Sequence, residues 1–329
     1  MMNVRNRRSQ KYRDGKGKYR KTRDRRSLVA RLLLGVAAVF LGCLVITTWG
    51  FLGKGFGEPA DKTGPSKPQS KTDLEVHFID VGQGDATLIK AGEHSMLIDA
   101  GDFRAGTAVQ LYLKKQGVDK LDYLVLTHTD ADHIGGADVI ITKFDIDTIF
   151  LGDYQKDTKA YRELMDALEY RNQSYSVPAV GTTWQLGDAA FTIVAPNQTY
   201  ENPNDSSLAL LLQNGAHTFL FTGDCEEAAE RDILANGLSV DCDVYQVGHH
   251  GSYTSSTKEF LNAITPEYAV ISCAKENPYG YPHTSVLKRL RSIGTTVLRT
   301  DEQGSIVAYS DGNTLTWSCE PEDSGNRKP

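Results

Sequence analysis

Cysteine is scarce in this sequence, and no two cysteines form a CxxC pair. The absence of such a pair leaves a zinc knuckle or a thioredoxin-like redox site without support. One cysteine lies in an apolar run near the N-terminus, and the even number that remains permits disulfides without predicting any. Because several of them occupy apolar, strand-like segments, we expect buried free thiols at Cys225, Cys242, Cys273 and Cys319.

Charged side chains are absent from residues 32–53, which are rich in Leu, Val and Ala. An apolar helix of about 22 residues spans the ~30 Å core of a bilayer, and Trp49 and Phe51 stand where an interfacial aromatic belt is expected. A cleaved signal peptide is the alternative. Its apolar region is normally only ~7–15 residues long, and no clear small-x-small site follows this run. We therefore predict one transmembrane helix over residues 32–53.

Basic residues are scarce outside the N-terminal tail. Residues 1–31 contain 13 Lys or Arg and two acidic residues, whereas residues 32–329 contain 23 basic and 40 acidic residues, a formal net charge of −17. A basic segment before an apolar span keeps the N-terminus in the cytoplasm, so we expect the large C-terminal part to be extracytoplasmic. The tail is expected to contact anionic lipid; nucleic-acid binding by the tail is the alternative.

The rest of the chain divides by composition. Residues 54–72 hold Gly, Pro, Lys and Ser with little apolar content and are typical of a flexible linker. Residues 73–319 alternate strand-like and helix-like segments without an internal repeat, and residues 320–329 form a C-terminal tail. Strands in two sets with interspersed helices suit an α/β domain with four layers, αβ/βα, in which two facing sheets carry helices outside. Helical patterns are found at 106–117, 157–171, 226–236, 257–264 and 285–293.

The segment THTDADHIGG, residues 127–136, is the most informative stretch of the chain. It follows an apolar, strand-like segment and places four metal-binding side chains within six residues. An extended loop lets alternate side chains converge on one ion, while the last two turn toward a second ion. A merely solvated polar loop is the weaker alternative. The pattern therefore predicts a dinuclear metal site with ligands His128, Asp130, Asp132 and His133.

This loop resembles the HxHxDH loop of the metallo-β-lactamase fold hydrolases, with Asp130 in place of the second His. The HxDxDH variant is similar to that in the C-terminal domain of ComEC-type DNA-uptake proteins and their stand-alone relatives. The resemblance covers residues 73–319 and implies a four-layer metallo-β-lactamase sandwich. Further segments match in the same order, namely VGQGDA (81–86), LIDAG (97–101), NDSSLAL (204–210), FTGD (221–224) and VGHHGS (247–252).

The resemblance implies roles for residues that follow the later strands. Asp224 is expected to bridge two metal ions, a position that lowers their mutual repulsion; capping of the next helix is the alternative. His249 and His250 are adjacent, and adjacent side chains in extended backbone point in opposite directions. One then ligates metal while the other orients substrate or donates a proton, unless Gly251 permits a bend that turns both inward. Catalytic roles are expected for Asp132, His249 and His250.

Other residues are expected to support the site or contact substrate. Asp85 and Asp99 lie in glycine turns at strand ends, where the family's acids hold ligand histidines or loop backbone; simple turn chemistry is the alternative. Tyr281 stands where the family commonly has His, so either His283 reaches in, or Tyr281 supplies a phenolic donor, or the site is altered. The other residues expected to support the site or contact substrate are Ser252, Asn204 and Ser206. Asn204 and Ser206 lie in a segment where many relatives carry another metal-binding His.

The expected function is that of an extracytoplasmic hydrolase, anchored to the membrane by one helix, with two divalent ions, Zn²⁺ or Mn²⁺. Carboxylate-rich ligands shift the preference toward harder ions such as Mn²⁺. The resemblance implies attack by metal-activated water and points to a phosphodiesterase or nuclease that acts on DNA in a competence-like role. The net charge of −17 opposes DNA binding. The alternatives are a hydrolase of small or cell-envelope phosphodiesters, such as phosphorylcholine esters, and a degenerate metal-binding surface module.

Overall fold

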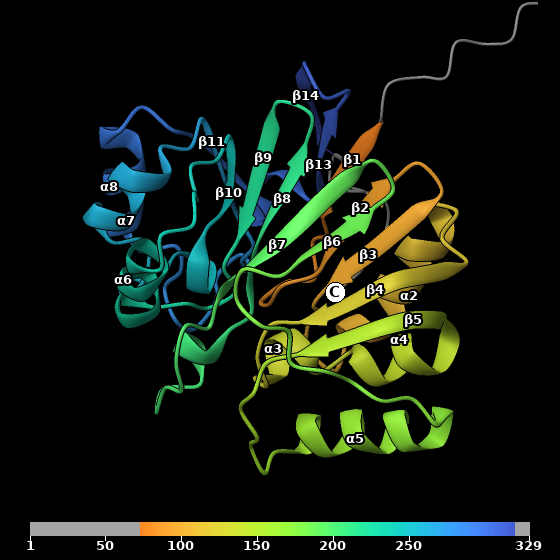
Figure 1. Ribbon diagram of the computed structural model, residues 1–329. Helices are drawn as coiled ribbons and strands as arrows, with labels where there is room; N and C mark the ends of the chain where they lie inside the picture. The colour runs from red at the N-terminus through yellow and green to blue at the C-terminus, as the bar shows by residue number, and fades with distance from the viewer. Residues whose placement is uncertain (1–72, 320–329) are drawn as a thin grey trace, which may run out of the picture. The chain divides into compact units, whose positions relative to one another are not determined.

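Two seven-stranded sheets lie face to face in the computed structural model, which describes residues 73–319 (Figure 1). In spatial order, the first sheet consists of β14 (Leu315–Cys319), β13 (Ile306–Ser310), β1 (Leu74–Phe78), β2 (Thr87–Ala91), β3 (His94–Ile98), β4 (Lys120–Leu126) and β5 (Asp145–Leu151). The second consists of β12 (Thr296–Arg299), β11 (Tyr268–Ile271), β10 (Val244–Gln246), β9 (His217–Phe221), β8 (Ala209–Asn214), β7 (Ala189–Ala195) and β6 (Thr183–Leu186).

Helices cover the outer face of each sheet, which confirms the predicted αβ/βα arrangement (Figure 1). The first sheet is covered by α2 (Ala105–Lys115), α4 (Ala137–Lys143) and α5 (Lys159–Arg171), with the short α3 (Ala131–Ile134) near its edge. The second sheet is covered by α6 (Glu227–Ala235), α7 (Lys258–Ile264) and α8 (Thr284–Ser292). The short α9 (Thr300–Gln303) and the 3₁₀ turns η1 (Asn204–Ser206) and η2 (Gly248–Gly251) complete the described elements.

The predicted tail, transmembrane helix and linker of residues 1–72, and the C-terminal tail 320–329, lie outside the described residues. Within residues 73–319, no helix combines the length and the apolar character that a bilayer span requires. Cys225, Cys242 and Cys273 are buried free thiols, as predicted. The prediction for the side chain of Cys319 lies outside what the structure describes.

Three apolar layers hold the sandwich together. Between the sheets, Phe78 of β1 stacks on Phe221 of β9, with ring centroids 6.2 Å apart. Burial of apolar surface is the dominant favourable contribution to folding, so these layers fix the scaffold that carries the strand ends. The two outer layers include Val109, Leu113, Ile140 and Leu164 beside the first sheet, and Ile233, Phe260 and Leu290 beside the second.

Helix α5 shows how local sequence defines an element. The side chain of Thr158 accepts a hydrogen bond from the backbone N–H of Tyr161 at the start of the helix. Asn172 ends the helix in the left-handed conformation, with φ of 51°. Leu164 and Leu168 lie one turn apart on the helix and are buried in the outer layer. The predicted helix 157–171 is therefore confirmed, and it begins two residues later than expected.

Residues 129–156 contain elements that the sequence pattern does not predict. Helix α4 has only seven residues, too few for a clear helical period. Strand β5 lies at the edge of the first sheet, where it pairs in parallel with β4. A seven-residue helix and an edge strand are defined by their packing against neighbours more than by local pattern.

The parallel strands bring the chemically important segments together. Strands β3, β4 and β5 run parallel in the first sheet, and β9, β10, β11 and β12 run parallel in the second. The carboxyl ends of parallel strands share one edge of a sheet, where ligands commonly bind. The segments that follow β4, β9 and β10 therefore meet at adjoining edges of the two sheets.

Candidate metal centre

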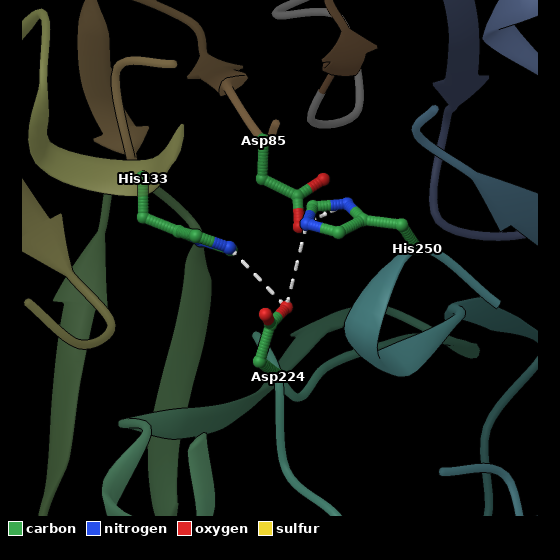
Figure 2. Close-up of side chains that lie close together, drawn as sticks. All are labelled: Asp85, His133, Asp224 and His250. Carbon is green, nitrogen blue, oxygen red and sulfur yellow. Dashed lines mark ion pairs between the residues drawn. The ribbon is translucent and has the colours of Figure 1, made fainter. Parts of the chain in front are cut away.

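Asp224 follows β9 and lies at the centre of a buried group of histidines. His128 and His133 come from the segment after β4, and His249 and His250 come from η2, after β10. Asp224, His128, His133 and His250 are at most 3 % exposed, and His249 is more open. Figure 2 shows His133 and His250 turned toward Asp224 from different elements. The structure thus brings together five of the residues that the sequence singles out.

The two carboxylate oxygens of Asp224 face different pairs of histidines. Oδ1 lies 3.2 Å from Nε2 of His133 and 3.7 Å from Nε2 of His250. Oδ2 lies 3.8 Å from Nε2 of His128 and 3.7 Å from Nε2 of His249. All four rings present the same nitrogen to one carboxylate. A carboxylate shared in this way can bridge two metal ions.

Asp99 orients the first two rings from behind. Nδ1 of His133 donates to Oδ2 of Asp99 at 2.8 Å. The hydroxyl of Thr127 donates to the same oxygen at 2.7 Å, so it accepts from Nδ1 of His128 at 3.2 Å. The backbone N–H of Thr127 donates to Oδ1 of Asp99 at 2.8 Å. With both Nδ1 atoms engaged, both Nε2 atoms are directed at Asp224, as in metal-ligating histidines that have a carboxylate partner.

The other two rings are oriented in the same sense. Nδ1 of His250 lies 3.0 Å from the carbonyl oxygen of Ser272. Because a carbonyl oxygen can only accept, Nδ1 donates and Nε2 faces the site. Nδ1 of His249 lies 3.1 Å from Oε1 of Glu226. The site therefore has four imidazoles, each with Nδ1 held and Nε2 directed inward.

His249 and His250 both face the site because the turn that carries them is left-handed. Their φ angles are 51° and 54°, in a region that non-glycine residues seldom adopt and that costs of order 1–3 kcal/mol per residue. Gly251 follows with φ of 81°, and a Cβ at this position would approach Cβ of Pro282 to 2.6 Å. Of the alternatives left open by the sequence, the structure adopts the bend that turns both rings inward.

Asp85 lies among the candidate ligands rather than behind them, which differs from the supporting role expected for it (Figure 2). One ligand atom from each of Asp85, His133, Asp224 and His250 lies within 4.8 Å of the other three. Neither carboxylate oxygen of Asp85 has a hydrogen-bond partner among the described residues, and burial raises the pKa of this group. A buried carboxylate without a partner is costly unless a cation or a proton offsets its charge.

Close backbone packing places Asp85 beside the metal-binding loop. Gly84 has φ of 134°, and a Cβ there would lie 2.3 Å from the carbonyl oxygen of Asp132. The backbone N–H of Asp85 donates to that same oxygen at 3.1 Å. The side chain of Asp132 accepts from Nε2 of His250 at 3.2 Å. The VGQGDA turn and the THTDADH loop are therefore joined directly at the site.

The donor set fits two divalent cations. Nε2 of His128 is buried without a hydrogen-bond partner, as are both oxygens of Asp85. Imidazole nitrogen and carboxylate oxygen suit Zn²⁺ and Mn²⁺ alike. The residues divide into a carboxylate-rich group and a histidine group that share one carboxylate. The first contains Asp85, Asp132, His133, Asp224 and His250, and the second contains His128, His249 and Asp224.

The same charges shift the pKa values of the histidines in opposite directions. Burial lowers the pKa of His250, but the neighbouring carboxylates, Asp224 first, raise it to about 9. Burial and the charge of His133 lower the pKa of His128 to about 4. Burial raises the pKa of Asp224, yet His133 and His250 hold it well below its usual range. Without an ion, the site therefore balances its carboxylates with protons on some of its histidines.

Asp130 is placed at the rim of the site. Its Oδ1 lies 2.7 Å from Nζ of Lys156, and its side chain is 30 % exposed. The charge of Asp130, like that of Asp224, partly opposes the lowering of the His128 pKa. In this structure the carboxylate of Asp130 pairs with Lys156 and not with a histidine of the site. The role of Asp130 as a metal ligand therefore stays a prediction.

Three predicted supporting residues lie around Glu226 and its neighbours. Nδ2 of Asn204 donates to Oε1 of Glu226 at 3.1 Å. The hydroxyls of Ser252 and Thr254 share a hydrogen bond of 2.9 Å, and Thr254 also donates to Glu226 at 3.1 Å. Ser206 donates to a backbone carbonyl of the preceding turn at 3.4 Å. Asn204 and Ser252 thus belong to the polar layer beneath His249.

Tyr281 reaches the site and His283 does not contact the clustered histidines. The hydroxyl of Tyr281 lies 3.2 Å from Nε2 of His249. Nδ1 of His283 accepts from the backbone N–H of Tyr253 at 3.1 Å, and His283 stands directly before α8. Of the three alternatives for this segment, the structure favours a phenolic donor from Tyr281.

The sequence pattern does not single out Glu226, Thr127 or Ser272. Ser272 acts through its backbone carbonyl, so its residue type carries no signal. Thr127 opens the metal-binding loop, and a hydroxyl beside a ligand histidine is the signal that identifies it. Glu226 lies two residues after the strand-end Asp224, a spacing that places its carboxylate near the same site.

Comparison with known proteins gives consistent matches. A model of the Metallo-beta-lactamase superfamily matches residues 79–275. ComE operon protein 3 of Bacillus subtilis (strain 168) is 31 % identical over 276 residues, and Competence protein ComA of Neisseria gonorrhoeae is 33 % identical over 239 residues. These alignments cover 77 % and 72 % of this chain but 35 % and 32 % of the relatives, so the chain spans about a third of their length.

Comparison with solved structures finds, among others, the metallo-beta-lactamase fold protein YhfI from Bacillus subtilis. It aligns with a TM-score of 0.49 at 11 % identity, over 74 % of this chain and 100 % of that one.

Proposed function

This chain belongs to the metallo-β-lactamase superfamily, and from that premise we propose that it is a hydrolase of phosphodiesters with two divalent metal ions. The observation that carries the proposal is the division of the Asp224 carboxylate between two pairs of histidine Nε2 atoms. A carboxylate shared between two groups of metal ligands is typical of dinuclear hydrolases. DNA is the first proposed substrate, because one similar protein carries competence in its name.

Asp224 would contribute one oxygen to each ion. When bound, two divalent ions lower the pKa of a water molecule and stabilise the charge that develops on phosphoryl oxygens. His133 and His250, with Asp85, would hold the first ion, and His128 with His249 would hold the second. Burial of these side chains keeps bulk water away and strengthens every charge interaction in the site.

Tyr281 is the residue best placed to contact the substrate. Its hydroxyl lies 3.2 Å from Nε2 of His249, at the more open side of the cluster. Burial raises the pKa of Tyr281, so the hydroxyl keeps its proton at neutral pH. A protonated phenol can donate a hydrogen bond to a phosphoryl oxygen as negative charge accumulates there.

A small or cell-envelope phosphodiester is the second candidate substrate. The observation in its favour is the formal net charge of −17 over residues 32–329. Nucleic-acid binding draws much of its affinity from Lys and Arg contacts with phosphates. A small ester such as a phosphorylcholine ester needs fewer such contacts.

Metal analysis and a substrate panel test the proposal. The full-length chain, purified in buffer with Zn²⁺ or Mn²⁺, is expected to carry about two ions per chain. It is then assayed on bis-p-nitrophenyl phosphate, single-stranded DNA and a phosphorylcholine ester. Metal-dependent cleavage of DNA supports the first substrate, and cleavage of the choline ester alone supports the second. A chain that binds metal but turns over none of these substrates would be a degenerate metal-binding surface module, and a chain without stoichiometric metal would contradict the dinuclear site.

The proposal includes a place at the cell surface. The uncharged run at residues 32–53 and the basic residues before it support a membrane anchor with the hydrolase outside the cytoplasm. Protease added to intact cells should then remove the C-terminal domain. Complete protection of the domain would reverse the orientation.

A further inference from the structure

A row of aromatic rings leads from the metal centre to solvent. The ring centroid of Tyr281 lies 5.5 Å from that of His249, and the ring centroid of Tyr279 lies 5.3 Å from that of Tyr281. The two tyrosine rings are stacked at an interplanar angle of 17°. Exposure rises along the row, because the His249 side chain is 17 % exposed and Tyr279 is 59 % exposed.

A single asparagine holds this row in place. Nδ2 of Asn277 donates to the carbonyl oxygens of Ala274 and Tyr281 at 2.9 and 2.7 Å. Oδ1 of Asn277 accepts from the backbone N–H groups of Tyr279 and Tyr281 at 3.2 and 2.9 Å. All the hydrogen bonds of the amide group are therefore directed into residues 274–281. Asn277 therefore holds the backbone of Tyr279 and Tyr281 in place before any ligand binds.

The same loop is attached to the turn that carries the histidine ligands. The backbone N–H of His283 donates to the carbonyl oxygen of Gly251 at 2.9 Å. Pro282 lies directly over Gly251, where no Cβ could be accommodated. The loop that carries Tyr279 is therefore joined directly to the turn that carries His249.

The stacked geometry favours a flat ligand. One face of Tyr279 is covered by Tyr281, so the surface that remains is a single outward face and its edge. Recognition of a quaternary ammonium group normally uses several aromatic faces around one point, and two parallel rings do not provide them. Stacking of one nucleobase on such a face contributes about 1–3 kcal/mol to binding, whichever base it is.

We propose that Tyr279 is a base-stacking platform that selects single-stranded nucleic acid for the adjacent metal centre. The inference rests on the proposed function, in which the centre cleaves phosphodiesters. Bases within a duplex are stacked on one another and do not offer a free face, whereas those of a single strand do. A strand with one base on Tyr279 has its backbone phosphate held beside Tyr281 and His249.

Binding to paired oligonucleotides tests the platform without requiring turnover. Fluorescence anisotropy is measured on the full-length chain in chelator, with a labelled oligothymidylate and with an abasic oligomer of the same length and charge. The parent chain should prefer the base-bearing oligomer. Tyr279→Ala should weaken its binding by about 5- to 150-fold, which corresponds to the stacking of one base, and should leave binding of the abasic oligomer unchanged.

Two further variants separate stacking from general damage. Tyr279→Phe keeps the ring and should bind like the parent chain. Tyr170→Ala removes a tyrosine that is 80 % exposed on α5, a helix that covers the first sheet, and should also bind like the parent. With metal added, the effect of Tyr279→Ala on cleavage of single-stranded DNA should fall on KM more than on kcat.

The outcomes separate this inference from the hydrolase proposal. Equal affinity of the parent chain for both oligomers, or no binding of either, would overturn the platform even if metal-dependent cleavage occurs. A base preference that Tyr279→Ala abolishes would support the platform, and the absence of cleavage in the same preparation would then count against the hydrolase alone. Competition by a choline ester that depends on Tyr279 would overturn base stacking in favour of ammonium recognition.

Discussion

Oε1 of Glu226 lies 3.1 Å from Nδ1 of His249, on the side of the ring away from the Nε2 atom that faces Asp224. Asn204 and Thr254 donate to the same carboxylate. The hydrogen bond with His249 is the main reason that the pKa of Glu226 lies below its usual value. An ionised Glu226 therefore determines which nitrogen of His249 is available for metal.

Loss of Glu226 should weaken the second metal position. Replacing a carboxylate that orients a ligand histidine typically reduces metal affinity or activity by about 10- to 100-fold. Glu226→Ala should show a loss of this size in a metal titration, with the first ion still bound. Glu227→Gln, at an exposed neighbouring position, is the matched control. Undiminished binding of two ions by Glu226→Ala would contradict the role of Glu226.

Asp132→Ala and Asp224→Ala should each reduce turnover by at least ~10²-fold, a loss typical of removing one group that stabilises a transition state. Asp224 faces all four histidines, and Asp132 accepts from His250. Loss of Asp224 should lower metal content in both positions, whereas loss of Asp132 should affect the first. Elemental analysis and steady-state rates measure both effects. Parent-like turnover and metal content in both variants would remove the case for a dinuclear site.

Metal binding should release protons at neutral pH. The pKa of His250 is raised to about 9 by the carboxylates around it, so without metal this ring is protonated at pH 7. A metal ion requires the lone pair of Nε2, so it must displace that proton, and apparent affinity should rise with pH up to about 9. Calorimetric titration with Mn²⁺ or Zn²⁺ in two buffers of different ionisation enthalpy measures the release. We expect at least one proton per chain, and a buffer-independent heat would contradict this assignment.

Glu230 should make the fold less stable as pH rises. This buried side chain accepts hydrogen bonds from the backbone N–H groups of Ser256 and Thr257, and burial raises its pKa to about 7. The pKa of Glu230 is higher in the folded state than in the unfolded state, so the folded state binds this proton more tightly. The resulting stabilisation of the fold is complete below about pH 4.5 and is lost as the pH rises to about 7. The change is on the order of 3 kcal/mol.

Denaturant unfolding in chelator, at pH 5 and at pH 8, measures the Glu230 contribution. The parent chain should lose more stability between these values than Glu230→Gln, which cannot ionise. An equal pH dependence in both chains would show that Glu230 does not titrate in this range.

The architecture could be predicted from the sequence more fully than the boundaries of its elements. The α5 segment is long, capped and periodic, so its helix follows from local pattern. Helix α4 has only seven residues and packs beside α2 and α5, and strand β5 depends on its pairing with β4, which no local pattern reveals. The pairing of β1 with β13, between residues more than 200 positions apart, is likewise invisible in a single sequence.

The candidate site was predictable where residue type carries the chemistry. Asp224 and the four histidines could be named from their motifs, because their own side chains are the candidate metal ligands. Asp85 was expected behind the ligands. Its place among them depends on the contact between Gly84 and the backbone of Asp132, which the sequence does not reveal. The inward turn of both His249 and His250 depends on two positive φ angles, which residue identity does not predict.

Strand β13 completes the first sheet from the far end of the chain. It pairs with β1 from Leu74 opposite Ser310 to Phe78 opposite Ile306, and β14 pairs with its other side. During synthesis from the N-terminus, β1 consequently remains an unpaired edge until residue 306 has emerged. A chain cut short in the region of α9 would retain every histidine around Asp224, yet it would expose the hydrogen-bonding groups of β1 as a template for aggregation. Residues 306–319 should thus protect the domain from aggregation, although none of them belongs to the metal centre.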